Sequence, residues 1–182
     1  GHEAVKDDLL EDIALARRIK ELGYRGGLLA SGGVSRCRMY ESWAEFKRGW
    51  KRIYTESANR RSDRLTTAGW RLLLTAGAMP LVAAAAMGMG LFVGGPIAGI
   101  GFVVGAVALA IMIVAMSVLH RGIEAPLGGV VAAPLGAFAV SGILLAAARD
   151  LRKGEPTQWA GRSYVREDRA KRRGRPTSES AA

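Results

Sequence analysis

The chain has 182 residues, 49% of them hydrophobic, and a formal net charge of +10. These values are compatible only if charged and apolar residues occupy different parts of the sequence. Residues 1–71 contain 15 Lys and Arg against 10 Asp and Glu, residues 72–148 contain one of each sign, and residues 149–182 contain 10 against 5. The single cysteine, Cys37, excludes an intrachain disulfide framework, and we assign it no role.

Apolar residues recur at near-helical spacing over residues 8–22, which predicts an amphipathic helix. Asp7 or Asp8 would cap this helix, and Glu11 would serve as the acid of a capping box. Capping does not account for Asp12, because a second acid in the first turn adds only about 0.3–1 kcal/mol through the helix macrodipole. Glu11 and Asp12 are therefore candidate catalytic carboxylates, and helix capping is the alternative for Glu11.

Two short extended segments are predicted next, at residues 24–31 and 33–40, separated by glycine. The two-residue period of a strand places Arg36 and Arg38 on one face of the second segment. Paired guanidinium groups bind diphosphate or carboxylate through bidentate hydrogen bonds. The alternative is a solvated pair of surface arginines.

The stretch "SWAEFKRGWKRIYTES" at residues 42–57 predicts a second helix, because Ser42 and Glu45 form an S-x-x-E capping box. One stripe of this helix is aromatic and apolar, and much of the remaining surface is cationic. The stripe contains Trp43, Phe46, Trp50 and Ile53, and the cations are Lys47, Arg48, Lys51 and Arg52. This pattern favours a helix that lies in the membrane interface over anionic headgroups, and the alternative is a helix packed on a soluble domain.

The apolar segment 72–148 has only two charged side chains, Arg121 and Glu124. A membrane span needs about 20 apolar residues, so this segment is long enough to cross a bilayer several times. Glycine, proline and charge interrupt it twice, which predicts three membrane-spanning helices. Their expected ranges are 72–93, 97–119 and 127–148.

Lysine and arginine crowd both ends of the apolar segment, so the positive-inside rule favours the cytoplasm for both flanks and an even number of crossings. Three crossings would put the flanks on opposite sides. Either one apolar stretch is re-entrant or split, or the tail is translocated despite its charge. Residues 149–182 are basic and low in apolar residues, so we expect them to be largely disordered, and we expect no nucleic-acid binding.

Five sequence features occur in a characteristic order: "EDIALARRIKELGYR", "RMYES", "EFKRGW", the multispan apolar region and "WAGRSY". In this order they resemble the C-terminal portion of membrane-bound family 2 glycosyltransferases, which are inverting enzymes with a GT-A catalytic domain. The resemblance runs from His2 to about Tyr164. It implies a mixed fold, in which the C-terminal remnant of an α/β GT-A domain is followed by an α-helical transmembrane bundle of about three spans.

The resemblance divides the chain into four parts. These are the end of the GT-A domain at 1–41, the interface helix and linker at 42–71, the transmembrane helices at 72–148 and the basic tail at 149–182. It implies transfer of a sugar from a nucleotide-sugar donor to a lipid or lipid-linked acceptor. It also implies a multi-pass protein of the cell membrane, as in the bacterial inner membrane, with its catalytic side in the cytoplasm.

In that family the acidic pair ends the catalytic domain and its aspartate is the general base, a role that the resemblance assigns to Asp12, with Glu11 beside it. The candidates for binding the acceptor or the diphosphate are Arg36, Arg38, Trp50 and His2. A divalent metal, Mg²⁺ or Mn²⁺, is implied, but its ligands belong to a D-x-D motif that this sequence lacks. We therefore expect the donor-binding half to be missing and this polypeptide alone to bind nucleotide sugar poorly.

The sequence departs from the family at one position of the interface helix. Many members have an arginine directly before the tryptophan, whereas Gly49 precedes Trp50 here. A non-catalytic membrane anchor or assembly module, which would associate with anionic membrane lipids, is the alternative function. The substitution Asp12→Asn separates the two, because only a transferase should lose its rate.

Overall fold

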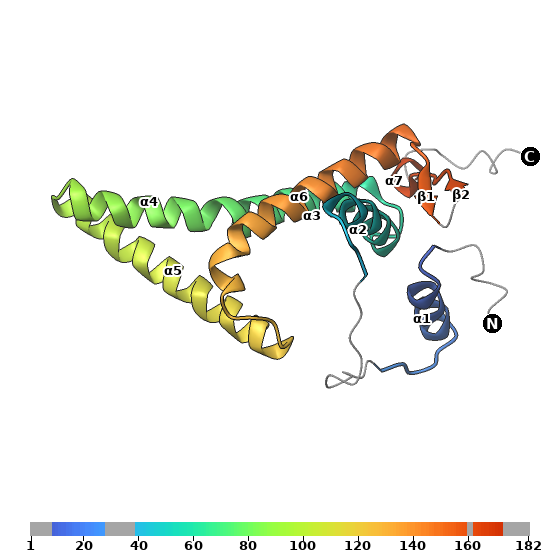
Figure 1. Ribbon diagram of the computed structural model, residues 1–182, viewed down its shortest axis with the longest axis horizontal. Coiled ribbons are helices and arrows are strands. Elements are labelled where there is room, and N and C mark those ends of the chain that lie inside the picture. Colours follow the sequence, from blue (N-terminus) through green and yellow to red (C-terminus); the bar gives the residue numbers. More distant parts are fainter. Residues whose placement is uncertain (1–8, 28–38, 160–161, 173–182) are drawn as a thin grey trace, which may run out of the picture. The chain divides into compact units, whose positions relative to one another are not determined.

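The computed structural model describes residues 9–27, 39–159 and 162–172. The chain divides into two compact units. The first, which we call the polar unit, combines the residues up to Leu65 with those from Ala146 onward, and the second, the apolar unit, is Thr66–Leu145. Helices dominate both units, and the sheet found within the described residues has two strands (Figure 1).

The first helix, α1, spans Glu11–Glu21, so it begins later than the predicted residue 8. Its N-cap is Leu10, which makes no side-chain capping bond, so the expected capping box with Glu11 is wrong. The reason is a tertiary contact. Leu9 is buried and its carbonyl accepts a hydrogen bond from Arg52 Nη1 at 3.2 Å, which holds this part of the chain outside the helix.

The second helix, α2, spans Trp43–Ser57, and its predicted start is confirmed. Ser42 Oγ accepts a hydrogen bond from the Glu45 amide at 3.2 Å, as an N-cap serine should. Glu45 completes the local network by accepting from the amide of Glu41 at 3.1 Å. After α2 the chain turns through Asn59 and Arg60, which both have positive φ, and α3 spans Ser62–Leu72.

Three helices are long and apolar enough to cross a membrane, so the protein is a membrane protein. They are Ser62–Phe92, Pro96–Gly122 and Gly129–Lys153. The first combines α3, the π-helical turn η2 (Leu73–Ala78) and α4 (Met79–Phe92), and the others are α5 and α6. The number of helices agrees with the prediction, and the first begins ten residues earlier than residue 72 because α3 continues into η2 without a break.

Small residues allow α4 and α5 to pack closely as a helical hairpin in the apolar unit (Figure 1). A Cβ atom at Gly105 would overlap the carbonyl oxygen of Ala83 and lie 3.0 Å from the amide nitrogen of Met87. Similarly, a Cβ atom at Gly90 would overlap the α5 backbone. Backbone therefore lies against backbone at these glycines.

Residues after α6 form a small ordered substructure. Strands β1 (Thr157–Trp159) and β2 (Arg162–Tyr164) pair antiparallel, with Gln158 opposite Ser163, and α7 spans Arg169–Arg172. The expectation that 149–182 is largely disordered is therefore wrong for the described part of this segment. Of the strands predicted at 24–31 and 33–40, the described residues 24–27 and 39–40 form none, and residues 28–38 lie outside the described part.

Candidate functional site

The two candidate catalytic carboxylates, Glu11 and Asp12, lie in the first turn of α1, and both are exposed. Asp12 Oδ1 accepts a hydrogen bond from the amide of Ile13 at 2.7 Å, which fixes the carboxylate at the helix N-terminus. The positive end of the helix macrodipole favours a negative charge there. Within the described residues Asp12 makes no ion pair, so its carboxylate is oriented by backbone and faces solvent.

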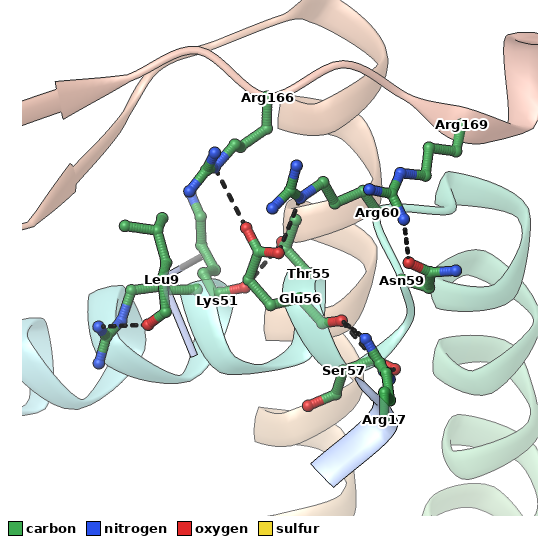
Figure 2. Close-up of polar contacts among 11 residues, drawn as sticks. Leu9, Arg17, Lys51, Thr55, Glu56, Ser57, Asn59, Arg60, Arg166 and Arg169 are labelled. Carbon is green, nitrogen blue, oxygen red and sulfur yellow. Dashed lines mark hydrogen bonds and ion pairs between the residues drawn. The ribbon is translucent and has the colours of Figure 1, made fainter. Parts of the chain in front are cut away.

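Arg17 connects α1 to the C-terminal end of α2 within the polar unit. Its guanidinium donates to the carbonyl of Ser57 at 2.9 Å and to that of Glu56 at 3.4 Å, as Figure 2 shows. The last carbonyls of a helix lack intrahelical donors and carry partial negative charge, so a cation stabilises them. Together with the bond from Arg52 to the Leu9 carbonyl, this contact positions the helix that carries Asp12.

An aromatic row runs along α2. Trp43 stacks on Phe46 with centroids 5.1 Å apart, Phe46 lies 5.8 Å from Trp50, and Trp50 lies 5.1 Å from Tyr54. Partial burial raises the pKa of the Tyr54 phenol. Trp43 is 54% exposed, so the row presents apolar surface to its surroundings.

The structure explains the glycine that precedes Trp50. A Cβ atom at Gly49 would overlap the ring of Tyr40, which packs edge-on against Phe46 with centroids 5.7 Å apart. Any side chain at this position would displace the tyrosine ring. Glycine at this position leaves the space that the Tyr40 ring occupies.

The four cations of α2 have different surroundings. Lys51 forms an ion pair with Asp150 at the end of α6, and Arg52 binds the carbonyl of Leu9, whereas Lys47 lies over the Trp43 ring. Arg48 is exposed and makes no ion pair within the part of the chain that the structure describes. Two of the four cations predicted to face headgroups thus bind protein groups instead.

Glu56 is the centre of a buried ionic cluster that sequence analysis did not identify. Its side chain is only 8% exposed, and it lies 2.8 Å from Arg60 Nε and 3.2 Å from Arg166 Nε (Figure 2). The spacing of Glu56 and Arg60 is the i,i+4 spacing of helical ion pairs and could have indicated one partner. Arg166 is 110 positions beyond Glu56, and no local pattern indicates that pairing.

The segment around Asp168 also contacts the start of α3. Asp168 is buried, and its Oδ1 accepts from the amides of Ser62 at 3.2 Å and Ala170 at 3.0 Å. Arg169 donates its amide to the carbonyl of Arg60 at 2.9 Å, and its guanidinium binds Asn59. Non-glycine residues with positive φ cost about 1–3 kcal/mol each, so these contacts stabilise the strained turn at Asn59 and Arg60.

A cavity of about 190 Å³ lies in the polar unit between α2, the end of α6 and the β1 strand. Charged and polar side chains from all three elements line it over a small apolar floor. Its lining includes Arg48, Lys51, Thr55, Asp150, Gln158 and Arg166.

The predicted site residues are only partly covered by the structure. Arg36, Arg38 and His2 lie outside the described residues. Trp50 lies in the aromatic row of α2, and across the described residues no hydrogen bond or ring contact joins it to Asp12. The described residues contain no group of three or more His, Cys, Asp or Glu side chains that could hold a metal ion.

Comparisons of the sequence with protein-family models, and of the chain with curated proteins and with solved structures, gave no match.

Proposed function

We propose that this chain is part of a membrane-bound inverting glycosyltransferase of family 2, which transfers a sugar from a nucleotide-sugar donor to a lipid or lipid-linked acceptor. The observation that carries the proposal is the exposed carboxylate of Asp12, fixed at the N-terminus of α1. Arg17 holds that helix on the aromatic helix α2, which directly precedes the first apolar helix.

In the proposed reaction Asp12 accepts the proton of an acceptor hydroxyl while the oxygen of that hydroxyl attacks the anomeric carbon of the donor. A new C–O bond forms on one face of the sugar as the bond to the nucleotide diphosphate breaks on the other, which inverts the configuration. Arg36 and Arg38 are the proposed cations for the departing diphosphate. When bound, a divalent metal would supply further positive charge to that diphosphate.

The acceptor site is proposed to lie beside α2. A helix with an exposed aromatic row suits the membrane interface, where aromatic rings are favoured. Trp50 would there contact a lipid acceptor as it enters from the bilayer. The catalytic side is proposed to face the cytoplasm of a bacterial inner membrane, because the residues around α1 and α2 are strongly basic.

A non-catalytic membrane anchor or assembly module is the second candidate. It is favoured by the sequence, which contains no D-x-D motif to hold a metal–diphosphate group. Such a module would use the aromatic row and apolar helices to bind the bilayer, and Asp12 would have no chemical role.

The test compares wild type with Asp12→Asn in the complete gene product that contains this chain. Membranes that contain either protein are incubated with radiolabelled nucleotide sugars and bacterial lipid extract, and label in the lipid fraction is counted. Because general base catalysis contributes about 10²–10⁴-fold, Asp12→Asn should reduce incorporation by that factor. Glu11→Gln should have a smaller effect, since Glu11 is the neighbour of the proposed base.

Glu21→Gln is the matched control, because it removes one negative charge from an exposed position at the other end of α1. It should retain wild-type incorporation. Equal labelling by wild type and Asp12→Asn would show that Asp12 is not the base. Absence of labelling with every donor would favour the anchor.

A further inference from the structure

The cavity between α2, α6 and β1 is lined by residues other than those proposed above for catalysis and acceptor binding. Arg48, Lys51 and Thr55 follow one another on one face of α2, at spacings of three and four residues, and all line the cavity. Arg166 and Gln158 line it from the C-terminal substructure. Figure 2 shows Lys51, Thr55 and Arg166 converging from these separate elements.

The charge around this cavity is positive even after the ion pairs are counted. Asp150 faces both Lys51 and Arg149, Glu56 faces both Arg60 and Arg166, and Glu155 lies 3.8 Å from Lys153. The charged side chains that line the cavity itself are three cations, Arg48, Lys51 and Arg166, and two carboxylates, Asp150 and Glu155. The lining therefore has one positive charge in excess, which favours an anion.

The cavity also combines polar donors with an apolar floor of Ala147, Leu151 and Pro156. The floor belongs to the last two turns of α6 and the residues that follow it, where the apolar stretch gives way to Arg149, Arg152 and Lys153. In a membrane helix this transition marks the depth of the headgroups. An anion with an adjoining apolar part fits such a cavity better than a simple inorganic ion.

We propose that this cavity binds a phosphate group, with Arg48 as its principal ligand and Lys51 and Gln158 as additional donors. Arginine binds phosphate through two parallel hydrogen bonds, and the ion pair with Asp150 holds Lys51 in position beside it. The phosphate comes either from an anionic lipid headgroup or from a soluble phosphate or diphosphate. The proposal does not depend on the glycosyltransferase assignment, because binding is measured without turnover.

The test uses the purified chain in dodecyl maltoside and compares wild type, Arg48→Gln and Lys47→Gln. Each substitution removes one positive charge from neighbouring exposed positions of α2, but Lys47 lies over the Trp43 ring and does not line the cavity. One arm measures retention of phosphatidylglycerol against phosphatidylcholine by native mass spectrometry. The other arm titrates inorganic pyrophosphate by calorimetry.

Arg48→Gln should weaken binding of the natural type of phosphate ligand by about tenfold or more, because the substitution removes charge-assisted hydrogen bonds to the phosphate. Lys47→Gln should stay within about twofold of wild type, because Lys47 makes no such bond. Gln158→Ala should weaken binding severalfold. Because Gln158 lines the cavity from β1 and Arg48 lines it from α2, this result would confirm that the ligand lies between the two elements.

The two arms separate the sources of the phosphate. If Arg48→Gln loses binding of phosphatidylglycerol but not of pyrophosphate, the ligand is a lipid headgroup. If it loses binding of pyrophosphate but not of phosphatidylglycerol, the ligand is a soluble phosphate. Equal binding by wild type, Arg48→Gln and Lys47→Gln in both arms would overturn the proposal.

Discussion

The polar and apolar units of this chain are held together by different interactions. In the polar unit, ion pairs and side-chain bonds to backbone join distant segments, as Glu56 does with Arg166 and Asp168 with the amide of Ser62. In the apolar unit, glycines let helices approach, as at Gly105 against Ala83. The exposed side chains of the apolar unit are mainly large hydrophobic ones, such as Phe92 and Ile97.

This difference reflects the two solvents that the chain must satisfy. In hydrocarbon there is no hydrophobic driving force for helices to associate, so close backbone packing replaces the burial of large side chains. In the polar unit, buried ion pairs such as that of Glu56 with Arg166 join segments that are distant in the sequence. Each unit therefore has its own sensitivity to substitution.

The first test of the difference between the two units asks on which side of the membrane the residues before and after the apolar helices lie, which we call the two flanks. The polar unit contains residues from before the first apolar helix and from after the last, joined by pairs such as Glu56 with Arg166. Both flanks must then lie on one side of the membrane, which requires an even number of complete crossings between them. One of the three apolar helices is therefore expected not to cross completely, as a re-entrant stretch would not.

The measurement is cysteine labelling with a membrane-impermeant maleimide in intact and permeabilised cells, in a Cys37→Ser background. Ser57→Cys on α2 and Ser163→Cys on β2 are both exposed positions. The expected result is all-or-none, with both cysteines labelled only after permeabilisation. Labelling of Ser163→Cys but not of Ser57→Cys in intact cells would place the flanks on opposite sides of the membrane. The contacts between the two flanks in the polar unit could then not form.

The second test is Glu56→Gln, which leaves the guanidiniums of Arg60 and Arg166 beside a neutral amide. Removing one partner from a buried ion pair costs about 3–5 kcal/mol, so amide hydrogen exchange in α1 and α2 should accelerate by about 10²–10³-fold. Exchange in α4 and α5 should not change. The control is Glu155→Gln, an exposed carboxylate whose ion pair contributes about 0–1 kcal/mol.

The Glu56 prediction fails if exchange accelerates equally in both units. Such a result would mean that the chain unfolds as one cooperative body. Equal exchange in Glu56→Gln and wild type would instead show that the cluster contributes nothing to the polar unit.

Sequence patterns predicted the parts of this fold that depend on local chemistry. The near absence of charge between residues 72 and 148, with two interruptions by glycine, proline and charge, indicated three apolar helices, and the spacing of Ser42 and Glu45 indicated the start of α2. The start of α1 was wrong because a distant side chain, Arg52, holds Leu9 outside the helix. The C-terminal substructure was missed because Arg166 and Asp168 are ordered by partners more than 100 residues away.

The candidate site was predictable to a similar extent. The position of Asp12 near a helix N-terminus was predicted from the local pattern, and the structure agrees. The contact of Arg17 with the end of α2 and the cavity at Arg48 depend on which helices meet. Helical periodicity gives the faces of a helix but not the partner of each face.

The smallest expected effect concerns the apolar unit and compares Gly105→Val with Gly99→Val. Both changes add the same side chain to α5, so the change in helix propensity is shared. At Gly105 the new Cβ atom would overlap the carbonyl of Ala83, whereas at Gly99 it has no neighbour within 4 Å. Gly105→Val should therefore destabilise the α4–α5 pair by about 1–3 kcal/mol, the usual cost of overpacking, and accelerate exchange in those helices alone. Equal exchange in the two variants would show that α4 and α5 do not meet backbone to backbone at Gly105, and the apolar unit would then need another source of stability.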